Sequence, residues 1–180
     1  MNNNLIITIS RQYGTGGREI GQKLALRLGI PFYDRELITR AAKKTGFDEK
    51  LFEQLDKRAT NSFLYSLTMF GSVGLNGMSL TDQLYLAQSN IIREMAEDSS
   101  CVIVGRCADH VLRDFPNKFD FFIHGSIEDR VKRIQTCGDY EIEGKTPEAA
   151  LEKMDKQRST YYNYYTGKVW GKCDHYDLCI

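Results

Sequence analysis

The sequence predicts an α/β fold in which helices cover both faces of a parallel β-sheet. Short apolar segments that suit buried strands recur along the chain. Segments with helical periodicity lie between them, and this alternation is typical of a parallel sheet. A glycine-rich turn joins the first strand to the first helix, which is a common arrangement where α/β proteins hold phosphate.

Residues 5–9, 17–28 and 31–33 are the first strand, the first helix and the second strand of this pattern. The strand segments are apolar on both faces. The helix segment has apolar side chains one turn apart and stops at Gly29, a common residue at a helix C-terminus.

A long segment, residues 35–100, contains no convincing strand, and we expect a helical insertion there. Its last part, residues 80–96, has clear helical periodicity. Residues 61–80 combine three glycines with large apolar side chains, and loops of this composition usually fold over something. A substrate cap, a mobile flap and a dimer contact are equally good interpretations of this segment. A homodimer is therefore one of the possibilities.

The second half of the chain adds predicted strands at residues 101–104, 119–123 and 176–180. Ser126 and Thr146 are typical helix-capping residues, so we expect a helix after each of them. The polar segment between these helices contains two glycines and suits a hinge. Because the chain ends within its last predicted strand, we expect a further C-terminal segment beyond it.

The composition restricts the classes of function. The 180 residues suit one domain, and 24 Lys and Arg balance 24 Asp and Glu, so the net charge is zero. Nucleic-acid-binding domains usually have a basic excess, which argues against a nucleic-acid partner. Five cysteines without a C-x-x-C pair suit reduced thiols, and no apolar run is long enough to span a membrane. We therefore expect a cytoplasmic protein without a membrane partner.

The glycine-rich turn consists of Gly14, Thr15, Gly16 and Gly17. Glycines let backbone N–H groups converge on an anion, and the following helix directs its positive dipole end toward the same point. Arg18 adds a full positive charge. The turn therefore predicts a phosphate site, although a strand-to-helix connection that only requires small residues would have a similar sequence.

Two standard nucleotide-binding patterns fit the turn incompletely. The dinucleotide pattern G-x-G-x-x-G has Glu19 in place of its third glycine, although Asp34 lies where a ribose-binding acid is expected. The triphosphate pattern G-x-x-x-x-G-K-[ST], matched at Gly17, has Gln12 for its first glycine, Arg18 for lysine and Glu19 for the hydroxyl. In this second match Arg18 binds phosphate through its planar fork, and Glu19 either meets Mg²⁺ or caps the helix.

Four segments are informative together, namely residues 9–20, 31–38, 104–106 and 161–171. In order and spacing they resemble the cytidylate kinase-like family, a divergent branch of the nucleoside monophosphate kinases, over essentially the whole chain. The resemblance implies a P-loop kinase fold with a five-stranded parallel sheet flanked by helices, a helical insertion that binds the nucleoside monophosphate, and a lid.

The same resemblance divides the chain, as one domain, into three parts. The core would comprise residues 1–34, 101–135 and 173–180. The helical insertion would be 35–100 and the lid region 136–172.

The resemblance also implies roles for single residues. Asp34 and Arg40 match the Y-L-D-T-G-A-M-Y-R motif of better-known cytidylate kinases, and Arg106 matches their G-R-D motif, although the aspartate is replaced. Asp155 and Arg158 reproduce a D-x-x-R pair associated with the lid and with cytosine recognition. All five would bind the acceptor.

The donor side of the implied site is the turn itself. Residues 14–19 would hold the phosphates of ATP, with Arg18 and Arg158 as the catalytic residues and Glu19 as a metal ligand. Family analogy places Arg130 and Arg133 near the lid hinge.

The implied reaction moves the γ-phosphoryl group of ATP, with Mg²⁺, to CMP or dCMP. A regulatory protein that binds nucleotides without catalysis stays open, because the lysine and hydroxyl of the standard pattern are replaced. A phosphotransferase with another small acceptor stays open as well.

Aromatic residues gather near the C-terminus: Tyr161, Tyr162, Tyr164, Tyr165 and Trp170. They suit either base stacking or packing of the lid on the core. The spacing of Tyr161 and Tyr165 puts both on one helical stripe, which favours packing.

Overall fold

The computed structural model describes residues 3–34, 80–138, 140 and 146–180, and within them the chain forms a parallel five-stranded sheet. The strands are β1 (Ile6–Arg11), β2 (Phe32–Tyr33), β3 (Cys101–Val104), β4 (Lys118–Ile123) and β5 (Leu178–Cys179). Their order in the sheet is β2-β3-β1-β4-β5, so β1 is central. The predicted α/β class and the parallel sheet are confirmed.

Strand β1 is paired on both sides and buried on both faces. Ile6 lies opposite Cys101 of β3 and opposite Lys118 of β4. Because side chains alternate along a strand, Ile6 joins the core on one face, whereas Ile7 and Ile9 join the core on the other. This double burial explains why Ile6, Ile7 and Ile9 are all apolar, and the buried hydroxyl of Thr8 between them donates a hydrogen bond to Asp120 at 2.6 Å.

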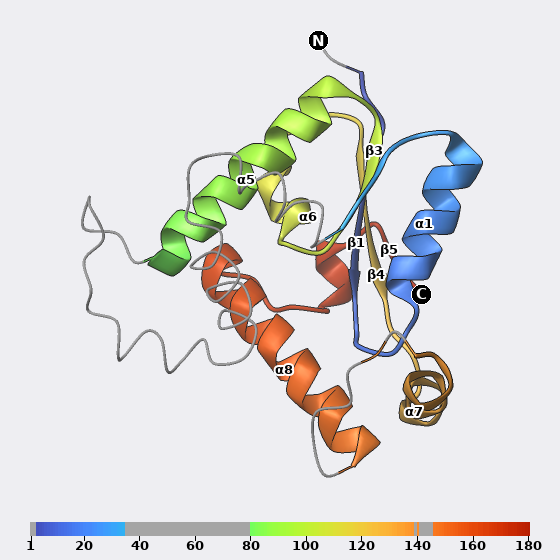
Figure 1. The fold of residues 1–180 in the computed structure, drawn as a ribbon. Coiled ribbons are helices and arrows are strands. Elements are labelled where there is room, and N and C mark those ends of the chain that lie inside the picture. The colour runs from blue at the N-terminus through green and yellow to red at the C-terminus, as the bar shows by residue number, and fades with distance from the viewer. Residues whose placement is uncertain (1–2, 35–79, 139, 141–145) are drawn as a thin grey trace.

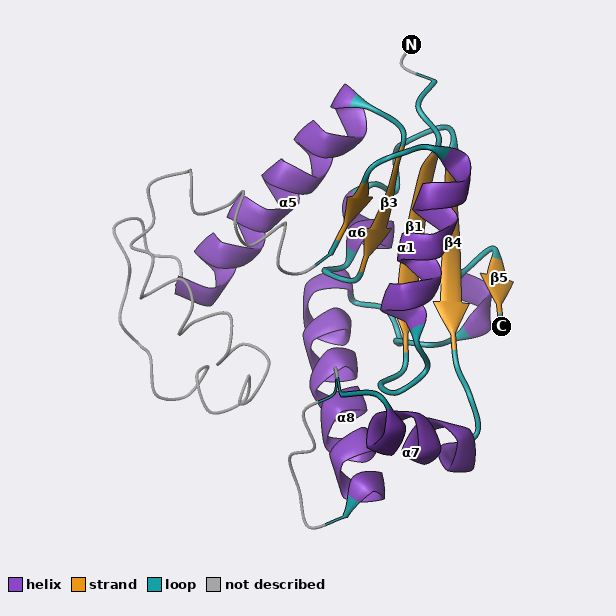
Figure 2. Cartoon of the chain, turned by 45° about the vertical axis from the view of Figure 1, so that its right-hand side comes forward, coloured by secondary structure: helices purple, strands orange, loops and turns teal. Residues whose placement is uncertain are grey.

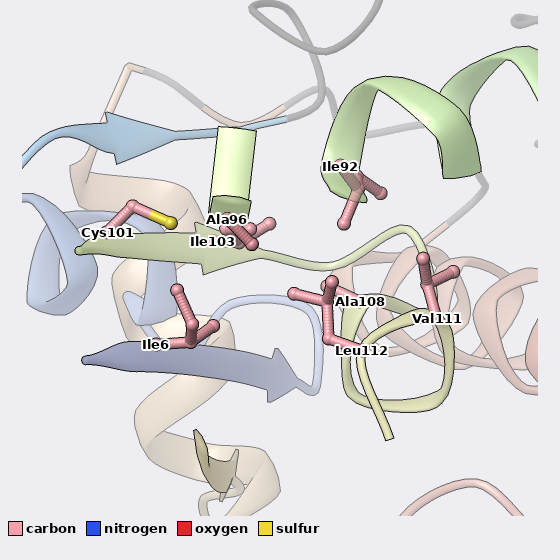
Figure 3. Close-up of a cluster of buried hydrophobic side chains, with 8 residues drawn as sticks. All are labelled: Ile6, Ile92, Ala96, Cys101, Ile103, Ala108, Val111 and Leu112. Carbon is pink, nitrogen blue, oxygen red and sulfur yellow. The ribbon is translucent and has the colours of Figure 1, made fainter. Parts of the chain in front are cut away.

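Helices cover the two faces of the sheet, as Figure 1 shows. Helix α1 (Gly17–Leu28) packs on one face, and α5 (Leu80–Asp98) and the short α6 (Ala108–Val111) pack on the other. Figure 3 shows the core of the second face, which consists of Ile6, Ile92, Ala96, Cys101, Ile103, Ala108, Val111 and Leu112.

Helices α7 (Ile127–Thr136) and α8 (Pro147–Thr166) lie at the carboxyl edge of the sheet, toward which the strand arrows point in Figure 2. Both begin at the predicted caps. The Ser126 side chain accepts a hydrogen bond from the N–H of Asp129 at 3.1 Å, and Thr146 accepts one from the N–H of Ala149 at 3.2 Å. Ligands of open parallel sheets bind at this edge, so the two helices border the expected site.

Some elements differ from the predictions. Helix α1 and strand β3 have the predicted bounds, but α6 was not predicted because one helical turn is too short to show periodicity. The last strand covers only Leu178–Cys179 of the predicted residues 176–180, and a 3₁₀ turn, η1 (Cys173–His175), precedes it. Among the residues that the structure describes, no helix is long and apolar enough to cross a membrane.

Several predictions fall outside the described residues. They concern Arg40, most of the helical insertion, its glycine-rich apolar part and most of the hinge.

Candidate functional site

The glycine-rich turn forms a loop between β1 and α1. Gly14 and Gly16 have φ angles of 81° and 76°, in the left-handed region that glycine adopts readily. Gly16 is also the cap residue of α1, and it provides no side chain to bind the first N–H groups of the helix. The first N–H groups of any helix have no partner within the helix, which makes a helix start of this kind suited to binding an anion.

The loop borders a cavity of about 420 Å³. Its walls include every residue from Arg11 to Glu19, together with side chains that follow β2 or come from α7 and α8. The start of α1 therefore opens into a space that suits phosphate groups.

Hydrogen bonds fix the shape of the loop. The N–H of Gln12 donates to the carbonyl of Ile123 at 2.9 Å, and its side-chain Oε1 accepts from the N–H of Gly125 at 3.2 Å. The hydroxyl of Thr15 donates to the carbonyl of Gln12 at 2.9 Å. The loop is thus tied to the end of β4.

A buried ion pair attaches the loop to α7 and α8. Asp155 of α8 accepts a hydrogen bond from the N–H of Tyr13 at 2.7 Å. Arg130 of α7 donates through Nε to the carbonyl of Tyr13 at 2.7 Å, and its Nη2 pairs with the other oxygen of Asp155. Both backbone groups of Tyr13 are therefore held by charged side chains, one from each helix.

Four arginines of the described chain line the cavity, namely Arg11, Arg18, Arg133 and Arg158. Arg18 Nε lies 2.6 Å from Asp34 Oδ2, and Arg133 pairs with Glu19. The structure thus brings the predicted residues Arg18, Glu19, Asp34, Arg133 and Arg158 to the glycine loop. Four cations against two carboxylates leave this cavity attractive to anions.

Glu19 is exposed and bound by two cations. Lys23 Nζ lies 2.6 Å from its carboxylate, and Arg133 binds the other oxygen. The hydrogen bond from Lys23, then the charges of Lys23 and Arg133, hold the pKa of Glu19 below its ordinary value. Glu19 is therefore ionised at neutral pH.

The carboxylates of this cavity fit a cation that arrives with phosphates. Mg²⁺ at phosphate sites typically takes one or two carboxylates, with the remaining positions filled by phosphate oxygens and water. Glu19 and Asp34 both line the cavity and could fill that role. The described residues contain no cluster of three or more His, Cys, Asp or Glu side chains, so they provide no all-protein metal cage.

A second cavity of about 110 Å³ adjoins the first. The two share Arg11, Val104, Met154 and Arg158. The second is also lined by the turn after β3, which includes Arg106, and by aromatic side chains of α8. The predicted residue Arg106 therefore lies beside the cavity of the glycine loop.

The turn after β3 has a strained backbone. Gly105, Arg106 and Cys107 have φ angles of 80°, 57° and 55°, so two non-glycine residues adopt the left-handed region in succession. Each such residue costs about 1–2 kcal/mol, and strain of this kind gathers at functional sites. The guanidinium of Arg106 lies 5.9 Å from the centre of the Tyr161 ring.

Arg158 is held against the first strand. Its Nη1 donates to the carbonyl of Arg11 at 2.9 Å, and its guanidinium lies 5.2 Å from the centre of the Tyr13 ring. Burial lowers the pKa of Arg158, although a guanidinium stays protonated in proteins. Arg158 lines both cavities, whereas Asp155 and Arg130, which hold the loop, line neither of them.

The tyrosines of α8 pack against neighbouring helices. The rings of Tyr165 and Tyr85 of α5 are stacked, with centroids 3.9 Å apart. Tyr162 donates to buried Asp109 of α6 at 2.6 Å, and burial raises the pKa of that carboxyl. The packing prediction is confirmed for Tyr162 and Tyr165, and Tyr161 and Tyr162 also line the smaller cavity.

Arg11 is the residue of this site that sequence reasoning missed. It is the last residue of β1 and lines both cavities. The triphosphate pattern gave no reason to select Arg11. With Gly17 as its last glycine, the pattern begins at Gln12, so Arg11 lies just before it.

A glycine loop between the central strand and the first helix of a parallel sheet is an arrangement of phosphate-binding α/β proteins, and the P-loop kinases have it. Residues 6–180 match the cytidylate kinase-like family, so the chain belongs to this family. The resemblance inferred from the sequence is confirmed.

Solved structures share the fold of this chain. The chain is 32% identical to an uncharacterized protein from Eubacterium ventriosum, with a TM-score of 0.69, over 98% of this chain and 88% of the other. It shares its fold with a shikimate kinase from Bacteroides thetaiotaomicron, at 14% identity and a TM-score of 0.56, over 98% of this chain and 85% of the other. The chain has no match among curated proteins.

Proposed function

We propose that the protein transfers the γ-phosphoryl group of ATP to the phosphate of CMP or dCMP. The observation that carries this proposal is the pair of adjoining cavities, which share Arg11 and Arg158. One cavity has the glycine loop for a donor, and the other has Arg106 for an acceptor. Phosphoryl transfer needs positioning and charge neutralisation above all, and both are supported by this arrangement.

On the donor side, the N–H groups of residues 14–19 bind the terminal phosphates of ATP. Arg18 and Arg158 contact these phosphates from two directions. Glu19 and Asp34 would hold Mg²⁺, which neutralises part of the charge of the triphosphate.

On the acceptor side, Arg106 binds the phosphate of the nucleoside monophosphate, and Arg40 is proposed to do the same. An oxygen of this phosphate attacks the γ-phosphorus of ATP. The bond from the γ-phosphorus to the bridging oxygen breaks, that oxygen keeps the electron pair, and ADP leaves. A phosphate monoester has its second pKa near 6, so no general base is required at neutral pH.

Arg106→Met is expected to raise the KM for the acceptor by about 10-fold to 100-fold, because a charged hydrogen bond to phosphate is lost. The KM for ATP should change little. Arg113→Met is the control, since Arg113 is exposed and lines neither cavity. Equal effects on both KM values would contradict the assignment of Arg106 to the acceptor.

A panel of nucleoside monophosphates, incubated with Mg-ATP and the protein, tests the reaction itself. We expect CDP or dCDP, detected together with an equimolar amount of ADP. If no nucleoside diphosphate forms from any acceptor although ATP binds, the regulatory alternative replaces the proposal. If another small acceptor is phosphorylated instead, the cytidylate specificity is wrong but the class of reaction stands.

A further inference from the structure

The start of α1 defines how the loop aligns with the triphosphate pattern. In that pattern the last glycine of the loop is followed by the lysine, where the helix begins. Here α1 begins at Gly17, directly after the left-handed Gly16. The match that agrees with this backbone takes Gly16 as the last glycine. Gly17 then occupies the position of the lysine, and Arg11 occupies the position of the first glycine.

The side chain of Arg11 covers Gly17. A Cβ atom at residue 17 would lie only 2.8 Å from both Cβ and Cγ of Arg11. Real Cβ contacts are longer than this, so a lysine at residue 17 would collide with the stem of Arg11. The two positions are therefore coupled: the arginine at one excludes a side chain at the other.

The guanidinium of Arg11 extends to the turn after β3. Its Nη1 would lie 2.5 Å from a Cβ atom at Gly105. The side chain thus passes between two glycines, from the glycine loop to the turn that carries Arg106. Arg11 accordingly lines both cavities, and its charged end lies on the side where donor and acceptor would meet.

We propose that Arg11 supplies the positive charge that the lysine supplies in the standard pattern, by binding the β- and γ-phosphates of ATP. This inference rests on the proposed function, since it takes ATP as the donor. The charge reaches the phosphates from the opposite end of the loop. A planar guanidinium can bind two phosphate oxygens at once, whereas an ammonium acts as a point charge.

The contacts of Arg18 support this assignment. Arg18 is half-exposed and forms an ion pair with Asp34 at 2.6 Å, so part of its charge is already balanced. In the alignment set by the helix, Arg18 stands at the hydroxyl position rather than at the lysine position. Arg158 fixes the backbone of Arg11 by a hydrogen bond to its carbonyl, which keeps the end of β1 in place.

Four variants test the inference. Arg11→Met removes the charge, Arg11→Lys keeps it, and Gly17→Lys adds a side chain where Arg11 lies. The double variant Arg11→Gly with Gly17→Lys restores the standard pattern at both positions. Arg27→Met is the control, because Arg27 is an exposed arginine in the last turn of α1.

Calorimetric titration with Mg-ATP and with inorganic tripolyphosphate measures the affinity of each variant. The stoichiometry of binding gives the fraction of each variant that is folded. Arg11→Met should weaken both ligands by about 10-fold to 100-fold, and Arg11→Lys by less than about 10-fold. Gly17→Lys alone should bind poorly, whereas the double variant should bind within about 10-fold of the wild type. Arg27→Met should bind as the wild type does.

The outcomes separate this inference from the proposed function. A wild-type protein that binds neither ligand would overturn both. A wild type that binds and turns over ATP, with Arg11→Met equally tight and equally fast, would overturn the role of Arg11 alone. A folded double variant that binds no better than Gly17→Lys would also overturn it. In that case a lysine at residue 17 would not replace the positive charge of Arg11.

Discussion

Gly16→Ala is expected to lower the affinity for ATP and the turnover rate by at least about 100-fold, and this is the largest functional effect that the structure predicts. Gly16 has a φ angle of 76°, which costs an alanine about 1 kcal/mol. The Cβ atom of an alanine at residue 16 would also lie 2.6 Å from Cζ of Arg133. The substitution therefore displaces Arg133 from Glu19 and narrows the anion cavity at the start of α1.

Gly29→Ala provides a matched control for Gly16→Ala. Gly29 has a φ angle of 66°, and a Cβ atom there would meet nothing within 4 Å. Both variants should lose a similar stability from backbone strain, measured by urea denaturation. Only Gly16→Ala should lose ATP binding, measured by calorimetric titration. Equal ATP affinities in the two variants would show that the cavity at Gly16 does not bind the nucleotide.

Arg130→Met is expected to lower the free energy of unfolding by about 3–5 kcal/mol, because it leaves Asp155 as a poorly solvated charge without its partner. The side chains of Arg130 and Asp155 are only 7% and 17% exposed. The carbonyl of Tyr13 loses its charged donor as well. For a chain of this size, the melting temperature should fall by roughly 6–20 °C.

Urea denaturation of Arg130→Met should be compared with Lys132→Met, which removes an exposed cation from the same helix. Lys132→Met should change the free energy of unfolding by less than about 0.5 kcal/mol. Adding Asp155→Leu to Arg130→Met should cost less than the sum of the two single effects, because no unpaired charge is left. A loss of less than about 1 kcal/mol in Arg130→Met would show that the pair is not a main support of the loop.

The first strand, the loop and the first helix could be predicted because their signals are local. A mostly apolar strand, a run of glycines and one apolar helical face lie next to one another in the sequence. The helix accordingly begins and ends at the predicted residues, Gly17 and Leu28. Asp34 could be placed at the end of β2 for the same reason, because it directly follows that strand in the sequence.

The roles of Arg11 and Asp155 could not be predicted, because they depend on contacts between distant segments. Spacing puts Asp155 and Arg158 on one face of α8, which suggested a common ligand. Instead Asp155 contacts Arg130 and the backbone of Tyr13, while Arg158 contacts the backbone of Arg11. The sequence shows which face a side chain occupies but not which loop packs against it.

The strained turn at Gly105, Arg106 and Cys107 also determines where this protein could gain stability. Glycine in place of the arginine would relax a left-handed backbone and favour the folded state by about 1 kcal/mol. At residue 106 the same change would remove the guanidinium that lines the smaller cavity. Selection for stability would therefore favour glycine at residue 106, whereas selection for ligand binding would favour arginine. The protein has the arginine.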